Sequence, residues 1–276
     1  MIAPLKVDGA TRLYGIVGDP IVQVRSPEVY CAQFAAAGMN AVLVPLHVRV
    51  DDFEAVMPQL VKLYNLDGLL ITSPFKNRAL SLARRVGPAA ACIGAINALR
   101  READGSWSGD MFDGEGFVRG LLAKGERVEG RRVLLFGAGG AAGAIACALA
   151  AAGVATLRIV DPDRVQCERL VAAAATAFPR CDIAAATVAR EGFDMVVNAS
   201  PVGMKPGDGL PGDIGRLTPE TLVGDVVLSK EPTAILRAAV AAGCRWVDGH
   251  DMHSGQIAAV MGFFAPDNAG QAPANR

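Results

Sequence analysis

Short apolar runs alternate with Ala-rich helical segments along almost the whole chain, a pattern typical of parallel α/β units. In the N-terminal part this pattern predicts strands at 13–17, 41–46 and 68–72 and helices at 27–37, 52–63 and 77–85. Ser26 is a suitable N-cap for the first helix, Pro27 suits its first position, and Gly38 can end it. Pro58 should kink or split the second helix.

A hairpin is predicted next, because strands 97–101 and 106–110 flank an Asp-Gly turn. Further helices are predicted at 113–124, 140–152, 164–178, 233–242 and 252–264. Strands alternate with them at 132–136, 156–160, 183–188, 195–198, 223–228 and 245–247. A loop rich in proline and glycine occupies 201–215, and we expect the polar tail 267–276 to be disordered.

Composition narrows the class of protein. The 276 residues, 51% of them hydrophobic, suffice for one large domain or two modest ones. The net charge of -1, with acidic and basic residues mixed, gives no basic stripe for nucleic acid. The first residues lack the apolar core of a secretory signal, and 141–155 is too short and glycine-interrupted to span a bilayer. We therefore expect a soluble, cytoplasmic protein without nucleic-acid or membrane partners.

Cysteine and histidine give no sign of a metal site. The six cysteines include no CxxC pair, and the three histidines have no zinc-type spacing. We expect free thiols that pack as small apolar side chains in a reducing compartment, and no bound metal.

A glycine-rich segment predicts a dinucleotide site. The strand 132–136 runs directly into a G-x-G-x-x-A turn and a helix, the context that this motif requires. Gly137 would allow the tight turn, Gly139 the approach of a pyrophosphate to backbone N–H groups, and Ala142 close packing of helix on strand. The helix N-terminus favours an anion there. The expected cofactor-binding residues of this turn are Gly137, Ala138, Gly139, Gly140 and Ala141.

The next strand ends at Asp161, at the position where an acidic residue accepts hydrogen bonds from the ribose hydroxyls of NAD. The same carboxylate would repel the 2′-phosphate of NADP, so we expect NAD rather than NADP. Arg164 lies close enough to weaken that argument, and Asp161 could also cap the helix that follows Pro162.

Six short segments, in order along the chain, resemble the shikimate/quinate dehydrogenase family. They are 18–21 with 25–27, 71–76, 94–97, 113–116, 198–204, and Gly249 with Met252 and Gln256. The resemblance implies hydride transfer between a secondary alcohol and a ketone on a small hydroxylated cyclic acid. It also implies two α/β domains: a substrate-binding domain of 1–112 plus 249–276, and a Rossmann-type NAD-binding domain of 113–248, with the active site in the cleft between them.

The family motifs assign Lys76 and Asp113 as the catalytic pair. An ammonium can exchange the hydroxyl proton and stabilise the developing alkoxide, an effect worth about 10²–10⁴-fold. A carboxylate at about 4 Å would hold that charge with roughly 4 kcal/mol at an effective dielectric constant of 20. Lys76 could instead be a solvated lysine at a helix start, and Asp113 could be only the N-cap of the following helix.

The resemblance assigns further binding residues. Ser26 would bind the substrate, as the remaining one of the family's two carboxylate-binding serines. Substrate hydroxyls would be bound by Thr72, Asn97 and Gln256, which could instead be ordinary strand-end, turn and surface residues. The nicotinamide side of the cofactor would lie against Asn198, Ser200, Val202, Met204, Val226 and Gly249. His253, one turn before Gln256, could line the same wall or be structural.

The chain departs from the family pattern on the substrate side. Val24 stands where the family has the first of two carboxylate-binding serines, and Leu70, Phe112 and Leu228 replace its usual Asn, Thr and Tyr. Losing such partners costs about 1–3 kcal/mol each, so the substrate could be a related polyol rather than shikimate. Arg25 and Lys230 are candidate replacements.

Two alternatives stay open: a folate-type methylene dehydrogenase, and a non-catalytic NAD-binding or sensor protein. The sequence decides neither the reaction direction nor whether the protein is a monomer or a homodimer.

Overall fold

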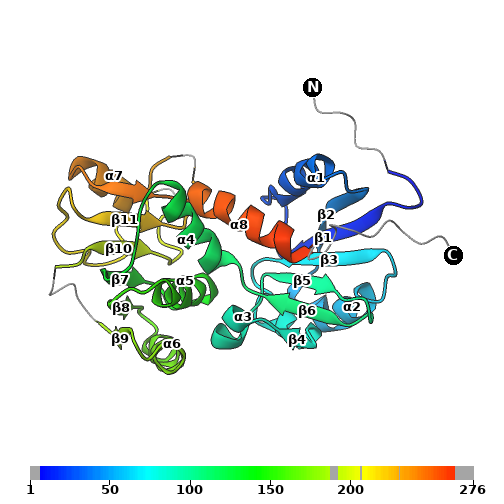
Figure 1. The fold of residues 1–276 in the computed structure, drawn as a ribbon, viewed down its shortest axis with the longest axis horizontal. Coiled ribbons are helices and arrows are strands. Elements are labelled where there is room, and N and C mark those ends of the chain that lie inside the picture. Colours follow the sequence, from blue (N-terminus) through cyan, green and yellow to red (C-terminus); the bar gives the residue numbers. More distant parts are fainter. Residues whose placement is uncertain (1–6, 187–191, 206, 230, 265–276) are drawn as a thin grey trace. The chain divides into compact units, whose positions relative to one another are not determined.

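The computed structural model describes residues 7–186, 192–205, 207–229 and 231–264 (Figure 1). The chain forms two compact units: Met1–Gly87, Gly94–Asp110 and Ile257–Arg276 make the first, and Pro88–Ile93 with Met111–Gln256 make the second. The chain thus passes from the first unit to the second between residues 110 and 111 and returns between 256 and 257. In addition, the six residues Pro88–Ile93 of the N-terminal part belong to the second unit. The assignment of substrate and cofactor binding to separate domains stays a prediction.

The first unit contains a six-stranded sheet in the order β2-β1-β3-β5-β6-β4. Its strands are β1 (Arg12–Gly18), β2 (Ala41–His47), β3 (Leu66–Ile71), β4 (Arg85–Val86), β5 (Ala98–Arg101) and β6 (Trp107–Asp110). β1, β2 and β3 are parallel, whereas β5 is antiparallel to both β3 and β6. The helical elements are α1 (Ser26–Ala36), η1 (Val50–Asp52), α2 (Phe53–Leu60) and η2 (Arg78–Leu82).

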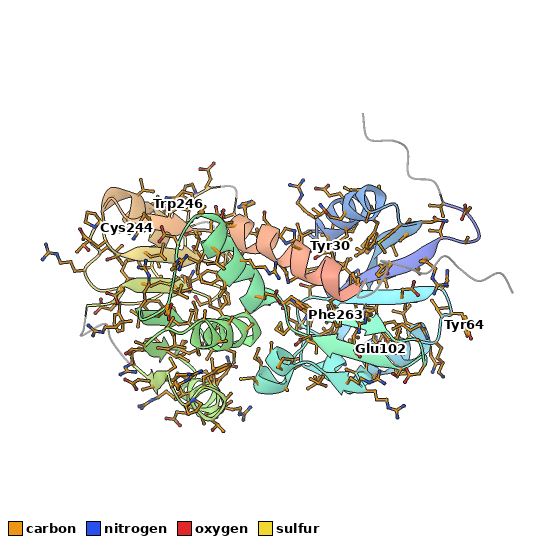
Figure 2. All side chains as sticks on the ribbon, in the orientation of Figure 1. Tyr30, Tyr64, Glu102, Cys244, Trp246 and Phe263 are labelled. Atoms are coloured by element: carbon orange, nitrogen blue, oxygen red, sulfur yellow. The ribbon has the colours of Figure 1, made fainter. Side chains whose placement is uncertain are left out.

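Aromatic side chains form much of the core of this unit. The rings of Tyr14 and Phe34 lie 4.6 Å apart, and Phe264, at the end of α8 (Gly249–Phe264), lies 4.9 Å from Tyr14. Tyr30, labelled in Figure 2, completes the cluster and is 2% exposed. The last turns of α8 are thereby attached to β1 and α1, while its residues up to Gln256 belong to the second unit.

The second unit is built on a fully parallel six-stranded sheet in the order β12-β11-β10-β7-β8-β9. Its strands are β7 (Arg132–Phe136), β8 (Thr156–Val160), β9 (Asp182–Ala185), β10 (Met195–Asn198), β11 (Leu222–Asp225) and β12 (Arg245–Val247). The chain order reverses between β7 and β10, which is the topological switch point of a Rossmann-type sheet. Ligands of such folds bind outside the carboxyl ends of the strands at that point.

Helices cover both faces of this parallel sheet (Figure 1). The helices are α3 (Pro88–Ile93), α4 (Asp113–Ala123), α5 (Gly140–Ala151), α6 (Arg164–Ala177) and α7 (Ala234–Ala241). Val133 and Leu135 of β7 pack in the cluster that includes residues of α4, α5 and α6, whereas Leu134 and Phe136 pack in the cluster that includes residues of α7. Burial on both faces explains why the central strands β7, β10 and β11 are nearly continuous apolar runs.

Several predicted details were wrong. Ser26 is the first residue of α1, and its helix has Arg25 as N-cap without a side-chain hydrogen bond. Residues 77–85 form the short 3-10 helix η2 and then β4, not an α-helix, and α3 was not predicted. β11 ends at Asp225 rather than 228, and α8 begins at Gly249 rather than 252.

Pro58 lies inside α2, which ends two residues later, at Leu60. The strand predicted at 183–188 comprises Asp182–Ala185, and its last two predicted residues, together with Lys230 and the tail 267–276, lie outside the described residues. Among the residues that are described, no helix has the length and apolar composition needed to cross a membrane.

Candidate functional site

The glycine-rich turn follows β7 at the switch point of the second unit. Gly137 has a φ of 106°, a backbone conformation that favours glycine. A Cβ atom on this residue would lie 2.8 Å from the carbonyl oxygen of Ala199, so the turn also passes too close to the end of β10 for a side chain. The first glycine of the motif is therefore required by both conformation and space.

The next two glycines leave one side of the turn open. A Cβ atom on Gly139 would have only the Gln166 side chain within reach, at 4.0 Å, and one on Gly140 would have nothing within 4 Å. Gly139 is the N-cap of α5, and Ala141 is the second residue of that helix. Ala142 is fully buried against the sheet. An open backbone at a helix N-terminus can accept a phosphate group, because its N–H groups and the helix dipole favour an anion.

Asp161 connects the end of β8 to this turn. Its Oδ2 atom accepts a hydrogen bond from the Ala138 N–H at 2.7 Å, and its Oδ1 atom accepts one from the Asp163 N–H at 2.8 Å. The N-cap of α6 is Asp163, which accepts from the Gln166 N–H. The alternative interpretation of Asp161 as the cap of this helix was therefore wrong. Arg164, the first residue of α6, is exposed.

A buried polar cluster lies at the carboxyl ends of β10 and β11. The carboxylate of Asp225, which is fully buried, accepts hydrogen bonds from Asn198 Nδ2 at 3.0 Å, from the Val227 N–H at 3.1 Å and from the Thr233 hydroxyl. Burial raises the pKa of Asp225, and the three donors oppose that rise. Because each partner comes from a different segment, the cluster fixes three segments at one point.

The loop after β10 is held by hydrogen bonds that begin at Asn198. Its Nδ2 atom donates to the Val202 carbonyl at 2.8 Å, and its Oδ1 atom accepts from the Ser200 hydroxyl at 2.6 Å. Further along, Asp208 accepts from the Gly203 N–H at 2.8 Å. The side chain of Met204 is 70% exposed. The loop is thus fixed at its base and presents an apolar side chain at its tip.

Val226 and Gly249 meet beside this loop. The Val226 N–H donates to the Asn198 carbonyl at 3.0 Å, and a Cβ atom on Gly249 would lie 2.7 Å from the Val226 carbonyl oxygen. All the residues predicted for the nicotinamide side are therefore close to the ends of β10 and β11. The prediction missed Asp225 and Thr233, although an aspartate inside the otherwise uncharged run 222–228 could have identified the former.

In the first unit, backbone hydrogen bonds bring Thr72, Lys76 and Asn97 to the end of β3. The Ile71 N–H donates to the Asn97 carbonyl at 2.8 Å, and the Ile96 N–H donates to the Lys76 carbonyl at 2.9 Å. Asn97 is 4% exposed, and Lys76 is half-buried. Lys76 lies in the turn that precedes η2, so its interpretation as a lysine at the start of an α-helix was wrong.

The N-terminal loop lies next to this strand end. The Asp19 N–H donates to the Ser73 carbonyl at 3.2 Å, and a Cβ atom on Gly18 would lie 2.5 Å from Thr72 Cγ2. Asp19 also accepts from His47 Nε2 at 2.8 Å and from the Val50 N–H at 3.0 Å. The hydrogen bond from His47 lowers the pKa of Asp19. The sequence analysis placed Asp19 in the family-like segment 18–21 without giving it a role, and it did not include His47.

Asp113 and Gln256 form a direct pair in the second unit. Asp113 is 5% exposed, and its Oδ1 atom accepts from Gln256 Nε2 at 2.9 Å. The N-cap of α4 is Phe112, so Asp113 is the first helical residue and not the cap. A Cβ atom on Gly116 would lie 2.7 Å from Gln256 Cβ, so glycine allows α4 and α8 to approach. Burial lowers the pKa of His253, as does the neighbouring His250, while Asp113 opposes the shift.

Comparison with known proteins identifies the family. The family model "Shikimate dehydrogenase substrate binding domain" matches residues 16–99. The chain is 39% identical over 254 residues to the shikimate dehydrogenase (NADP(+)) of Rubrobacter xylanophilus, and the match covers 90% of this chain and 88% of that protein. The chain belongs to the shikimate dehydrogenase family. This membership removes the folate-type alternative.

Solved structures of the family have the same fold. Shikimate 5-dehydrogenase from Listeria monocytogenes, in complex with shikimate and NAD, has a TM-score of 0.87 at 27% identity, with 95% of this chain and 94% of that one covered. Quinate dehydrogenase from Corynebacterium glutamicum, in complex with NAD, has a TM-score of 0.84 at 30% identity, with 93% of this chain and 94% of that one covered. 5-Ketofructose reductase of a Gluconobacter strain also has a TM-score of 0.84, at 27% identity and with the same coverage of the two chains.

The residues that depart from the family pattern have different environments. Leu70 and Phe112 are each 7% exposed, and Leu70 lies in the middle of the first-unit sheet, opposite Ile16 and Ala98. Val24 is half-buried in the turn before α1, and Leu228 is 61% exposed. Two of the four substitutions therefore add apolar side chains to the interior.

Proposed function

We propose that this protein is an NAD-dependent oxidoreductase that interconverts a secondary alcohol and a ketone on a small polyhydroxylated substrate of the shikimate or quinate kind. The observation that carries the proposal is the end of β7, where an open glycine backbone at a helix N-terminus lies beside the carboxylate of Asp161. This arrangement suits a dinucleotide, and it occurs in a chain of the shikimate dehydrogenase family.

The residues of the second unit fit NAD. The backbone N–H groups of the 137–141 turn would bind the pyrophosphate, and Asp161 would accept hydrogen bonds from the ribose hydroxyls. Although both carboxylate oxygens of Asp161 already accept one hydrogen bond, each has capacity for another. When bound, the nicotinamide supplies the hydride acceptor or donor. Asn198, Ser200, Val202, Met204, Val226 and Gly249 would contact that end of the cofactor.

The choice of NAD over NADP rests on charge. A 2′-phosphate beside Asp161 would meet a carboxylate, and the repulsion disfavours NADP. The curated relatives are named as NADP(+) enzymes, whereas the Listeria and Corynebacterium structures contain NAD. Both cofactors thus occur among relatives, so the residues around Asp161 carry the argument for this chain.

Lys76 and Asp113 would perform the proton transfer. The ammonium of Lys76 would take up or release the proton at the reacting hydroxyl oxygen and stabilise the alkoxide that forms when hydride leaves. Asp113 would hold the charge of Lys76 by ion pairing. The hydrogen bond from Gln256 fixes the Asp113 carboxylate, so one of its oxygens has a defined direction.

The substrate is proposed from the polar groups of the first unit. Ser26, Thr72 and Asn97 would bind its hydroxyl groups, together with Gln256. Val24 removes one hydroxyl from the N-terminal loop, which weakens the case for a carboxylate and strengthens the case for an uncharged polyol. The similarity to 5-ketofructose reductase supports including such a compound.

The test is a set of initial rates with shikimate, quinate, aminoshikimate and 5-ketofructose, each with the NAD and the NADP couple. We expect turnover of at least one compound, with a higher kcat/KM for the NAD couple. No turnover of any compound, together with NAD binding measured by calorimetry, would instead favour a non-catalytic sensor. A preference for NADP would overturn the role of Asp161.

A further inference from the structure

Two of the six cysteines lie side by side in the second unit. Cys92 of α3 and Cys147 of α5 are 55 residues apart in the sequence, yet their Sγ atoms are 2.7 Å apart. That separation is about 0.7 Å longer than the S–S bond of a disulfide. The sulfur atoms of three others instead form hydrogen bonds with main-chain groups, namely those of Cys31, Cys167 and Cys244. The pair is therefore a specific feature of the contact between α3 and α5.

Packing between the two helices holds the thiols together. A Cβ atom on Gly143 would lie 3.0 Å from Ile93 Cγ2, so glycine at this position allows α3 to approach α5 closely. Ala90, on the same short helix, is fully buried. Cys147 lies one turn after Gly143 and on the same face of α5, because residues four apart are neighbours on a helix. The docking that brings Ile93 onto Gly143 therefore also brings Cys92 onto Cys147.

We propose that Cys92 and Cys147 are a redox-active pair that forms a reversible disulfide within the second unit. Cys92 is half-buried and accessible to a small reagent, whereas Cys147 is 3% exposed. Burial also raises the pKa of the Cys147 thiol and keeps it protonated, so Cys147 is not the initial nucleophile. The two cysteines thus have different roles, attack by Cys92 and resolution by Cys147.

The oxidant is a low-molecular-weight disulfide such as oxidised glutathione. The Cys92 thiolate attacks one sulfur of that disulfide, forms a mixed disulfide and releases one glutathione thiolate. Cys147 then loses its proton to solvent and attacks the Cys92 sulfur, which releases the second glutathione thiolate. Two protein thiols are oxidised and one glutathione disulfide is reduced to two thiols.

The disulfide would alter the start of the proposed cofactor site. It would link α3 covalently to the helix whose N-terminus follows the glycine-rich turn, and it would close a loop that contains α4, β7 and that turn. Since residues 88–93 are joined on both sides to segments of the first unit, the bond would also fix the chain where it passes between units. We expect slower hydrogen exchange over 140–147 and a higher Tm in the oxidised protein.

The experiment uses the full chain, equilibrated in glutathione buffers of increasing oxidising strength and then alkylated in denaturant. We expect two of the six thiols to become protected, a proteolytic peptide that joins Cys92 to Cys147, reversal by dithiothreitol, and a Tm increase of several °C. Protection of other cysteines, or a glutathione adduct on Cys92 that never resolves, would overturn the proposal.

Single-residue variants test the roles proposed for Cys92 and Cys147. Cys147→Ala should stop at the glutathione adduct on Cys92, and Cys92→Ser should form neither the adduct nor the disulfide. The matched control is Cys31→Ser, since Cys31 is equally half-buried but contacts the Leu43 main chain, and it should still form the disulfide. If Cys147→Ala does not fold, Cys92→Ser at the more exposed position still decides the outcome. The readouts require no enzymatic activity, so their failure is separate from failure of the proposed function.

Discussion

The strand ends of the two units hold their candidate functional residues in different ways. At the end of β3 in the first unit, Thr72, Lys76 and Asn97 are positioned by main-chain hydrogen bonds, such as those of Ile71 to Asn97 and Ile96 to Lys76. At the switch point of the second unit, side chains do this work. Asp161 bonds to the glycine-rich turn, and Asp225 gathers Asn198 and Thr233.

This difference predicts which of the two strand ends tolerates replacement of its side chains. Main-chain hydrogen bonds persist when a side chain is replaced, so we expect replacement of the candidate substrate-binding residues at the end of β3 to cost the fold less than replacement of a member of the Asp225 cluster. A buried side-chain cluster loses several bonds when one member is replaced. Relatives named for shikimate, quinate and 5-ketofructose share one fold, as this distinction leads one to expect. Each prediction below tests one side of the comparison.

The largest effect is expected for Lys76→Ala. Loss of the proton-transfer group should lower kcat/KM by about 10²–10⁴-fold, while the free energy of unfolding changes little because the Lys76 main chain holds the turn. Initial rates and chemical denaturation would measure the two quantities. The control is Lys62→Ala, which removes an exposed lysine just after α2 and should keep full activity. Full activity in the Lys76 variant would refute its role.

The Asp225 variants test the side-chain cluster. Asp225→Ala would leave three donors without an acceptor, each at about 1–3 kcal/mol, so we expect a loss of stability of about 3 kcal/mol or more. Asp225→Asn keeps one acceptor oxygen and should lose clearly less. The midpoint of urea unfolding measures the difference. Equal stability of the alanine variant and the wild type would show that the cluster does not hold the switch point.

The sequence predicted the central strands of the second unit closely, although it missed α3 and misplaced the end of β11 and the start of α8. The central strands β7, β10 and β11 are buried on both faces, so they are nearly uninterrupted apolar runs that end next to or at glycine, asparagine or aspartate. The predicted strands 132–136 and 156–160 match β7 and β8. The α/β class and the membership in the shikimate dehydrogenase family were confirmed as well.

What the sequence could not predict depends on contacts between distant residues. The six residues of α3 are too few to produce a helical period, and this helix exists because Ala90 and Ile93 dock on the second unit. Asn198, Asp225 and Thr233 are separated along the chain: the sheet register joins the first two, and Thr233 reaches them from the N-cap of α7. Cys92 and Cys147 are free thiols, as expected, but their position side by side also depends on a contact between distant residues. The pairing of Lys76 with Asp113 stays a prediction.

Alanine substitutions at two glycines would distinguish an effect on cofactor binding from an effect on stability. Gly139→Ala adds a methyl group where no protein atom lies closer than 4.0 Å, so the fold should be unaffected. If the pyrophosphate approaches this backbone, the methyl group would obstruct it, and the Kd for NAD should rise by about 10-fold, or about 1.4 kcal/mol. The control is Gly262→Ala in α8, which also has open space and should leave NAD binding unchanged. Calorimetric titration gives both values.

The smallest effect is expected on the choice of cofactor. Asp161→Ser removes the carboxylate that would repel a 2′-phosphate, and it weakens the bond to the Ala138 N–H. Because serine keeps a hydroxyl that can still bond to the ribose, only part of the about 1.5–3 kcal/mol of a hydrogen bond to a charged group is lost. The ratio of kcat/KM for NAD to that for NADP should therefore fall only by a few-fold. Asp163→Ser is the matched control: it removes the same charge two residues away, from a carboxylate that caps α6 and does not bond to the turn. If the two variants change the ratio equally, general electrostatics governs the preference, and the specific position of Asp161 at the glycine-rich turn does not.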